Sequence, residues 1–162
     1  VREFLQSARE EEIARVLFEY GEERLSRKIA AAIVSRRRDG RLPSTTRELA
    51  ELITAAVPAA ARHGRIHAAT RSFQGLRIHV NNELGELDSL LKNVILSVRP
   101  GGRVAILSFH SLEDREVKRV FKDREGDFRS LSKKPIEADE EESRRNPRSR
   151  SAKLRIAERV VR

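Results

Sequence analysis

Hydroxyl, imidazole and carboxylate side chains gather in one short run, Ser108-Phe-His-Ser-Leu-Glu-Asp114. The run follows Val104–Leu107, an apolar stretch rich in β-branched residues, which predicts a strand buried on both faces, as in a parallel sheet. Ser111 is then expected to cap a helix whose third position is Asp114, at the positive helix end. Because open α/β sheets bind ligands at the carboxyl ends of their strands, Ser108, His110, Ser111 and Asp114 are predicted to line a pocket.

Other interpretations of these residues stay open. Ser108 and His110 can simply satisfy backbone groups at the end of a strand, and Asp114 can be only a capping carboxylate. A metal-dependent hydrolase built on His110, Glu113 and Asp114 is a further hypothesis. Elsewhere, His63 and His67 have the spacing of paired zinc ligands, but Gly64 lies between them and no carboxylate is near. We predict no metal site.

The composition favours a polyanionic partner. The chain of 162 residues has 34 basic and 25 acidic side chains, a net charge of +9, and its basic excess is nearly all Arg, which suits phosphate. The alternative is a solubilising surface. Six Phe and one Tyr are few for a protein that stacks bases on a platform. The chain has no Cys, which excludes disulfides and thiolate metal sites.

No long apolar run or signal peptide is evident in the sequence. The segments that do carry apolar residues are too short to span a bilayer, and the first residues are polar and helix-like. We therefore expect a cytoplasmic protein without a membrane partner. The chain opens at Val1 and contains no Met, so we also expect either a processed chain or a piece of a longer one.

The periodicity of apolar residues predicts a helical subdomain over residues 1–65. Two helices, broken at Tyr20–Glu23, are followed by a third that begins at a capping box of Thr45 and Glu48 and ends at Pro58. Successive helices with short polar joints are typical of an all-helical unit rather than of alternating β and α units.

A stripe of apolar residues from Phe73 to Val98 predicts one long helix or two nearly collinear ones, with Gly75 and Gly85 as points of close approach. Polar side chains on its opposite face are either an ordinary solvated surface or contacts to phosphate or bases. A basic patch precedes and enters the last strand. The candidate nucleic-acid-binding residues are Arg71, Gln74, Arg77, Asn81, Arg115, Arg148, Arg150 and Lys153.

The rear of the chain changes character after the predicted helix of the central run. Asp123–Arg145 loses periodicity and contains an acidic run, which predicts a mobile, solvated loop. Ala152, Leu154 and Ile156 then alternate with Lys153 and Arg155, and this pattern predicts a half-buried strand that closes the sheet.

Several separated blocks together resemble one known family. Ile66–Leu84, Gly101–Arg115 and Asn146–Arg155, with Tyr20-Gly-Glu-Glu-Arg24 ahead of them, closely resemble the bacterial RsmH family, also called MraW. The blocks occur in the family's order and span nearly the whole chain. Two departures are small, because Ala68 stands where the family usually has Pro and Gly75 where it usually has Ala.

The resemblance implies an S-adenosylmethionine-dependent methyltransferase that methylates the N4 amine of a cytosine in 16S rRNA, at the decoding centre of the small ribosomal subunit. It also implies an α/β fold, in which a Rossmann-like class I methyltransferase sheet carries an inserted all-helical substrate-recognition subdomain. On this basis residues 1–65 are the helical subdomain, and residues 66–162 are the C-terminal half of the methyltransferase domain.

The family's Gly-rich S-adenosylmethionine loop and the acidic ribose-binding residue would precede Val1. Pro100-Gly101-Gly102 does not replace that loop, because it precedes a strand, whereas a cofactor loop follows one. We therefore expect no cofactor-binding residue in this chain, and a partial sheet that is inactive alone. A non-catalytic RNA-binding module derived from the same family is the alternative. The exposed edge of a partial sheet also invites pairing, so a homodimer is a candidate assembly.

Overall fold

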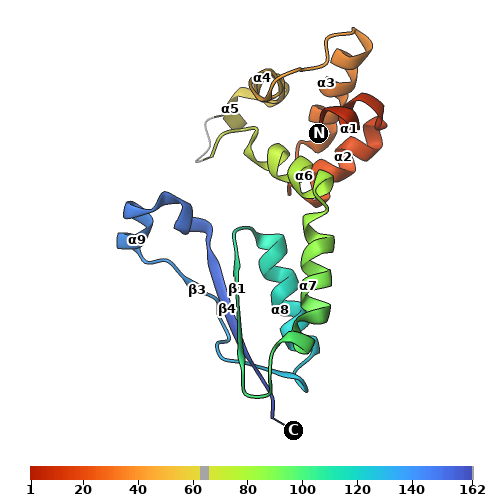
Figure 1. Ribbon diagram of the computed structural model, residues 1–162. Helices are drawn as coiled ribbons and strands as arrows, with labels where there is room; N and C mark the ends of the chain where they lie inside the picture. The colour runs from red at the N-terminus through yellow and green to blue at the C-terminus, as the bar shows by residue number, and fades with distance from the viewer. Residues whose placement is uncertain (63–65, 162) are drawn as a thin grey trace. The chain divides into compact units, whose positions relative to one another are not determined.

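The computed structural model describes residues 1–62 and 66–161. Its contacts divide the chain into a first unit, Val1–Glu83, and a second unit that begins at Leu84 (Figure 1). The boundary expected at residue 65, and His63, lie outside the described residues. In chain order the elements are α1 (Arg2–Ser7), α2 (Glu10–Glu19), α3 (Ser26–Arg38), α4 (Thr46–Ala56), α5 (Ala59–Arg62), α6 (Thr70–Val80), α7 (Glu83–Ser97), β1 (Arg103–Ser108), α8 (Ser111–Asp123), β2 (Phe128–Ser130), β3 (Ile136–Glu137), α9 (Glu140–Arg145), the 3-10 helix η1 (Pro147–Ser151) and β4 (Lys153–Arg159).

The regular elements of the first unit, in the residues that the structure describes, are all helices, as the apolar periodicity predicts. One face of α2 buries Ile13, Val16 and Leu17 against apolar residues of α3 and α4. The expectation of only two helices before residue 39 is wrong, because α1 forms a separate helix. Arg37 of α3 holds the end of α1, since its Nη1 donates to the carbonyls of Leu5 and Ala8 at 2.8 and 2.7 Å.

The capping box predicted for the third helical segment is confirmed. The Thr45 hydroxyl accepts from the Glu48 backbone N–H at 3.2 Å, and the Glu48 carboxylate accepts from the N–H groups of Thr45 and Ser44. The hydrogen bond from Ser44 lowers the pKa of Glu48. The helix α4 ends at Ala56, just before Pro58, as expected.

The apolar stripe from Phe73 onward forms two helices rather than one. Helix α6 ends at Val80, and α7 begins at Glu83, because Asn82 takes a left-handed φ of 52° that a helix cannot continue. The close approach predicted at Gly75 is confirmed. A Cβ there would lie 2.9 Å from the backbone nitrogen of Gly21, so α6 meets the end of α2 backbone to backbone.

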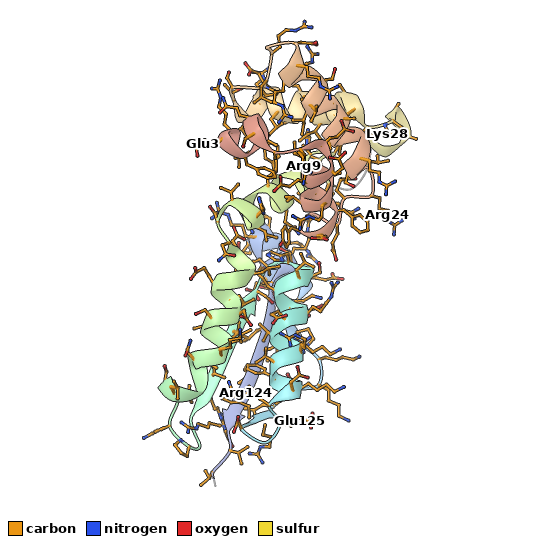
Figure 2. All side chains as sticks on the ribbon, turned by 90° about the vertical axis from the view of Figure 1, so that its right-hand side faces the viewer. Glu3, Arg9, Arg24, Lys28, Arg124 and Glu125 are labelled. Atoms are coloured by element: carbon orange, nitrogen blue, oxygen red, sulfur yellow. The ribbon has the colours of Figure 1, made fainter. Side chains whose placement is uncertain are left out.

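The second unit is a small antiparallel sheet with helices on one face. The strand order is β1-β4-β2, with β3 also paired to β4, and all pairings with β4 are antiparallel. Strands β1 and β2 are therefore parallel to each other, with α8 between them in the chain. Figures 1 and 2 show α7 and α8 along one face of the β1–β4 pair. The core between these layers includes Leu91, Val117, Phe121, Phe128 and Ala157.

Strand β1 is not buried on both faces, and that expectation is wrong. Ala105 and Leu107 are exposed, Leu107 by 53%, because the helices of the second unit cover only the face that Val104 and Ile106 share. Strand β1 also lies at the edge of the sheet, paired with β4 alone among the described strands. The pairing is antiparallel, whereas the sequence predicted a parallel sheet.

The two expectations for the rear of the chain are corrected in part. The last strand exists, but its faces are reversed, because Arg155 is buried and Leu154 and Ile156 are half-buried. The segment Asp123–Arg145 is not a featureless loop. It contains β2, β3 and α9, and Phe128 of β2 is fully buried in the core. Among the described residues, no helix combines the length and apolar character that crossing a bilayer requires.

Candidate functional site

The first predicted site residue, Ser108, ends β1 and lies opposite Lys153, the first residue of β4. Its side chain is buried, and its Oγ donates to the Lys153 carbonyl oxygen at 3.2 Å. The hydroxyl therefore closes the end of the antiparallel pair. This is the structural role that the sequence left open as the alternative to a ligand contact.

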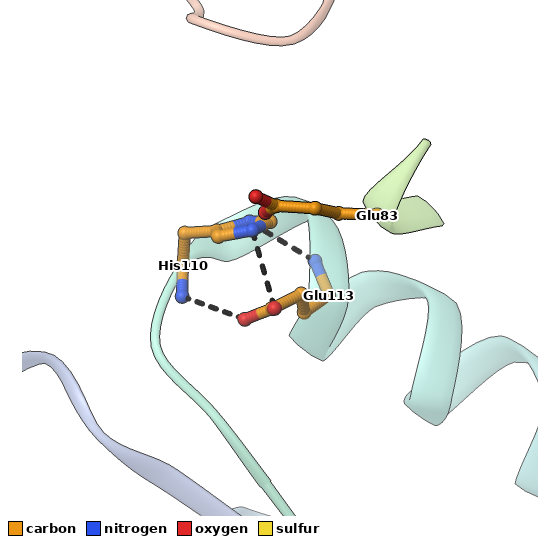
Figure 3. Close-up of side chains that lie close together, drawn as sticks. All are labelled: Glu83, His110 and Glu113. Atoms are coloured by element: carbon orange, nitrogen blue, oxygen red, sulfur yellow. Dashed lines mark hydrogen bonds and ion pairs between the residues drawn. The ribbon is translucent and has the colours of Figure 1, made fainter. Parts of the chain in front are cut away.

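His110, not Ser111, is the N-cap of α8, so the predicted cap is wrong by one residue (Figure 3). The His110 Nδ1 accepts from the Glu113 backbone N–H at 3.3 Å. The Glu113 carboxylate accepts from the backbone N–H groups of His110 and Phe109, at 3.3 and 2.8 Å. The imidazole thereby performs the role usually taken by a hydroxyl or carboxylate. Ser111 is the exposed first residue of the helix.

Asp114 faces the sheet instead of capping the helix. Its Oδ1 accepts from Nε of Arg155 at 2.7 Å and its Oδ2 from Nη2 at 3.1 Å. Both residues are buried, 9% and 8% exposed. The hydrogen bonds from the Arg155 guanidinium hold the pKa of Asp114 below its ordinary value, against the opposing effect of burial. This bidentate pair joins α8 to β4.

Two of the four predicted pocket residues, Ser108 and Asp114, meet at the start of β4. Lys153 accepts the Ser108 hydroxyl at its carbonyl, and its Nζ lies 4.0 Å from Asp114 and 3.8 Å from Glu137. The Asp114 carboxylate already accepts a hydrogen bond from Arg155, and Nδ1 of His110 already accepts one from the Glu113 backbone N–H. Nε2 of His110 lies 3.4 Å from Oε1 of Glu113, so these two residues of the hydrolase hypothesis do lie together. Asp114 does not join them, because its carboxylate is bound by Arg155, and the predicted set of three is not formed. Arg155 is the member of this cluster that sequence reasoning missed.

The candidate RNA-binding residues separate into two groups. In the first unit, Gln74 donates to the Tyr20 carbonyl at 3.1 Å, and Arg77 makes a bidentate pair with Glu83 at 2.8 and 3.0 Å. Asn81 also contacts Glu83, at 3.2 Å. These side chains, with Lys153, already have protein partners. Among these candidates, Arg71, Arg148 and Arg150 are exposed and form no ion pair within the described residues. Arg115 is also exposed, on α8.

Comparison with known proteins decides the family. A family model described as the MraW methylase family matches residues 1–160. The chain belongs to the MraW methylase family. The resemblance stated from its sequence blocks is thereby confirmed, and the matched region includes both units.

Relatives in this family are named as ribosomal RNA small subunit methyltransferase H. The one from Synechocystis sp. is 54% identical over 151 residues, which is 93% of this chain and 48% of that protein. The one from Deinococcus deserti is 50% identical, over 94% of this chain and 49% of that protein. For Persephonella marina the identity is 47%, over 92% and 51%. The chain thus spans about half the length of the curated relatives it matches.

A methylase family implies a methyl donor, and the Gly turn at residues 101–102 does not fit the loop that would hold it. The Gly turn before β1 is closed onto β4, because the Gly101 N–H donates to the Arg159 carbonyl at 2.9 Å and the Gly102 carbonyl accepts from the Arg159 N–H at 2.8 Å. In the described ranges 1–62 and 66–161, no Gly-rich loop follows a strand into a helix. The Asp114 carboxylate, in the first turn of α8, is bound to Arg155.

Proposed function

We propose that this chain is the rear part of an S-adenosylmethionine-dependent methyltransferase acting in the cytoplasm on the N4 amine of a cytosine in 16S rRNA, at the decoding centre. The observation that carries the proposal is the family match over residues 1–160, together with identities of about 50% to relatives named for the small ribosomal subunit. The methyl-donor site then belongs to the half of the relatives that this chain does not match.

The architecture of the second unit supports a partial class I methyltransferase sheet. Strands β1 and β2 are parallel, linked through α8, and separated by the antiparallel β4. The unpaired edge of β1 and the exposed Leu107 are what a longer Rossmann-like sheet with a second helical layer would cover. In this proposal the helical first unit is the inserted substrate-recognition subdomain.

The residues at the end of β1 then have a positioning role. Transfer to an exocyclic amine depends chiefly on holding the nitrogen in line with the methyl group. Ser108, His110 and Asp114 shape the end of β1 and the start of α8 through the contacts described above. Arg71, Arg148 and Arg150 are the proposed phosphate contacts, because they are exposed and form no ion pair with any carboxylate that the structure describes.

Methyl transfer tests the proposal directly. We expect the 162-residue chain alone to transfer no tritiated methyl group from S-adenosylmethionine to unmethylated 30S subunits. A longer polypeptide, in which this chain is joined to the half of its relatives that it does not match, is expected to transfer the methyl group. Nuclease digestion of the product, followed by chromatography, should identify N4-methylcytidine. Ordinary turnover by the chain alone, or methylation of another atom, would contradict the proposal.

Salt dependence of RNA binding tests the part assigned to this chain. We expect affinity for a fluorescein-labelled decoding-centre RNA to fall steeply between 50 and 200 mM salt, as counterion release requires. The double variant R148Q/R150Q should lower the slope of log affinity against log salt by about 1.4 to 1.8, if both arginines contact phosphate. A flat dependence would remove the RNA-binding role.

A matched control removes two cations that already have acidic partners. Arg47 pairs with Glu51 at 3.0 Å on α4, and Lys92 pairs with Asp88 on α7. The variant R47Q/K92Q therefore lowers the net charge equally but should change the slope much less. Equal slopes for the two double variants would mean that only the net charge matters.

A further inference from the structure

A groove in the first unit carries chemistry that the residues discussed so far do not use. It lies between α2 and the start of α3 and has a volume of about 760 Å³. Both elements belong to the same unit, so the groove is formed entirely within it. Its lining residues include Glu10, Glu11 and Phe18 of α2 and, from the second segment, Arg24, Arg27 and Lys28.

Phe18 is the unusual residue on α2. The apolar face of this helix buries Ile13, Val16 and Leu17, whereas Phe18 is 61% exposed and lines the groove. A large exposed ring costs solvation free energy, and an aromatic face in a groove can stack on another flat ring system. With six Phe and one Tyr in the chain, this is not a multi-base platform. It suits a single base.

Three cations stand on the α3 side of the groove. Arg24, Arg27 and Lys28 are exposed, and none of them has an ion pair among the residues that the structure describes. Figure 2 shows Arg24 and Lys28 projecting away from the first unit. Arg27 and Lys28 lie in the first turn of α3, which contains no acidic residue. Cations are unfavourable at a positive helix end, so local stability does not account for them.

Carboxylates line the other end of the groove. Glu10 and Glu11 begin α2, two helical turns before Phe18, which separates them from the ring by about 10 Å along the axis. The remaining cation, Arg15, pairs with Glu19 at 3.3 Å. The groove is therefore basic at one end, aromatic in its middle and acidic at the other end.

We infer that this groove holds one unpaired nucleotide of RNA, with its base stacked on Phe18 and its flanking phosphates on Arg24, Arg27 and Lys28. An RNA strand complements both ends, because its phosphates suit the cations and the amino groups of its bases can donate to Glu10 or Glu11. An acidic peptide would meet repulsion from those carboxylates. The inference rests on the proposed RNA-directed function and adds a specific contact for an unpaired base.

The test separates the base from the phosphates. Two fluorescein-labelled probes are used, a single-stranded oligocytidylate of 12 nucleotides and an abasic ribose-phosphate chain of the same length. We expect the wild-type chain to bind the base-bearing probe at least about fivefold more tightly, the lower end of what stacking on an aromatic ring gives. F18L should lose this preference while keeping its affinity for the abasic probe.

Substitution of a cation in the groove should affect both probes, unlike substitution of Phe18. R27Q is expected to weaken binding of both probes by a similar factor and to lower the salt slope by about 1. The control is R38Q, which removes an exposed Arg from the opposite end of the same helix. It should leave the base preference unchanged and lower affinity less than R27Q does. Hydrogen exchange in α2 and α3 shows whether each variant keeps its fold.

The outcomes distinguish the two proposals. If neither probe binds, the RNA-directed function itself is wrong. If the probes bind with steep salt dependence but F18L keeps the wild-type preference for bases, only the groove inference is overturned. If a twelve-residue polyglutamate binds, depends on Arg27 and is indifferent to Phe18, the occupant is an acidic polypeptide and the nucleotide inference is wrong.

Discussion

Replacing Asp114 with Asn is expected to destabilise the second unit by about 3 kcal/mol or more, because it leaves the buried Arg155 without its charge partner. Asn keeps the shape of the carboxylate, so packing is little changed. The expected readout is hydrogen exchange in peptides of β4, which should accelerate at least about a hundredfold, or lose protection altogether. Peptides of α2 and α3 in the first unit serve as an internal control and should not change.

A second variant distinguishes two effects of D114N. One is the unpaired buried charge of Arg155, and the other is the loss of the contact between α8 and β4. D114L/R155M replaces both ionic groups with apolar ones of similar size, and buried pairs exchanged in this way often lose little stability. We expect this double variant to recover most of the protection in β4. If it is as unstable as D114N, the pair itself stabilises the unit more than burial of apolar groups would.

The pH dependence should follow from the lowered pKa of Asp114, which the Arg155 hydrogen bonds cause. A carboxyl whose pKa is lower in the folded state stabilises that state above its unfolded pKa, about 3.9. This contribution is lost as the pH falls toward the folded pKa. The stability difference between wild type and D114N should therefore shrink as the pH is lowered from 5 to 3. An unchanged difference would mean that the Asp114 charge is not responsible.

Features coded by neighbouring residues were predictable from the sequence. The capping box at Thr45 and Glu48 depends on side chains three positions apart, and the structure forms it. The cap of α8 was misplaced because Ser is a common N-cap and His is not. His110 and Glu113 are three positions apart, as the two residues of a capping box are, and this spacing could have predicted the correct cap.

Features that depend on distant residues were not predictable from a local pattern. Alternation in the last strand placed Arg155 on the exposed face, but Arg155 is buried because Asp114, 41 positions earlier, supplies two hydrogen bonds. The face of β1 that carries Leu107 was expected to be buried, since apolar runs do not reveal how many helical layers cover a sheet. Phe128 was assigned to a loop because a three-residue strand is too short to show periodicity.

Substituting Ala for Gly21 is expected to destabilise the first unit by about 3 kcal/mol, the upper end of the range for overpacking. A Cβ at this position would lie 2.4 Å from the Arg71 carbonyl oxygen and 2.6 Å from that of Leu17. Both are backbone atoms. The overlap with Arg71 is relieved only if α6 moves away from the end of α2, and the overlap with Leu17 only if the end of α2 itself changes conformation. Exchange in peptides of α2 and α6 should accelerate, whereas β4 should stay protected.

Two further glycines test whether the backbone contact is the cause. G75A places its Cβ at 2.9 Å from the Gly21 nitrogen, a less severe overlap at the same crossing, so a smaller loss of stability in the same unit is expected. Gly40 has a positive φ of 70° and open space around it. G40A should therefore cost only the backbone strain of about 1–2 kcal/mol. G21A and G75A introduce the same methyl group on opposite sides of one contact. The distances therefore require G21A to lose more stability than G75A. A larger loss for G75A would show that α2 and α6 do not meet there.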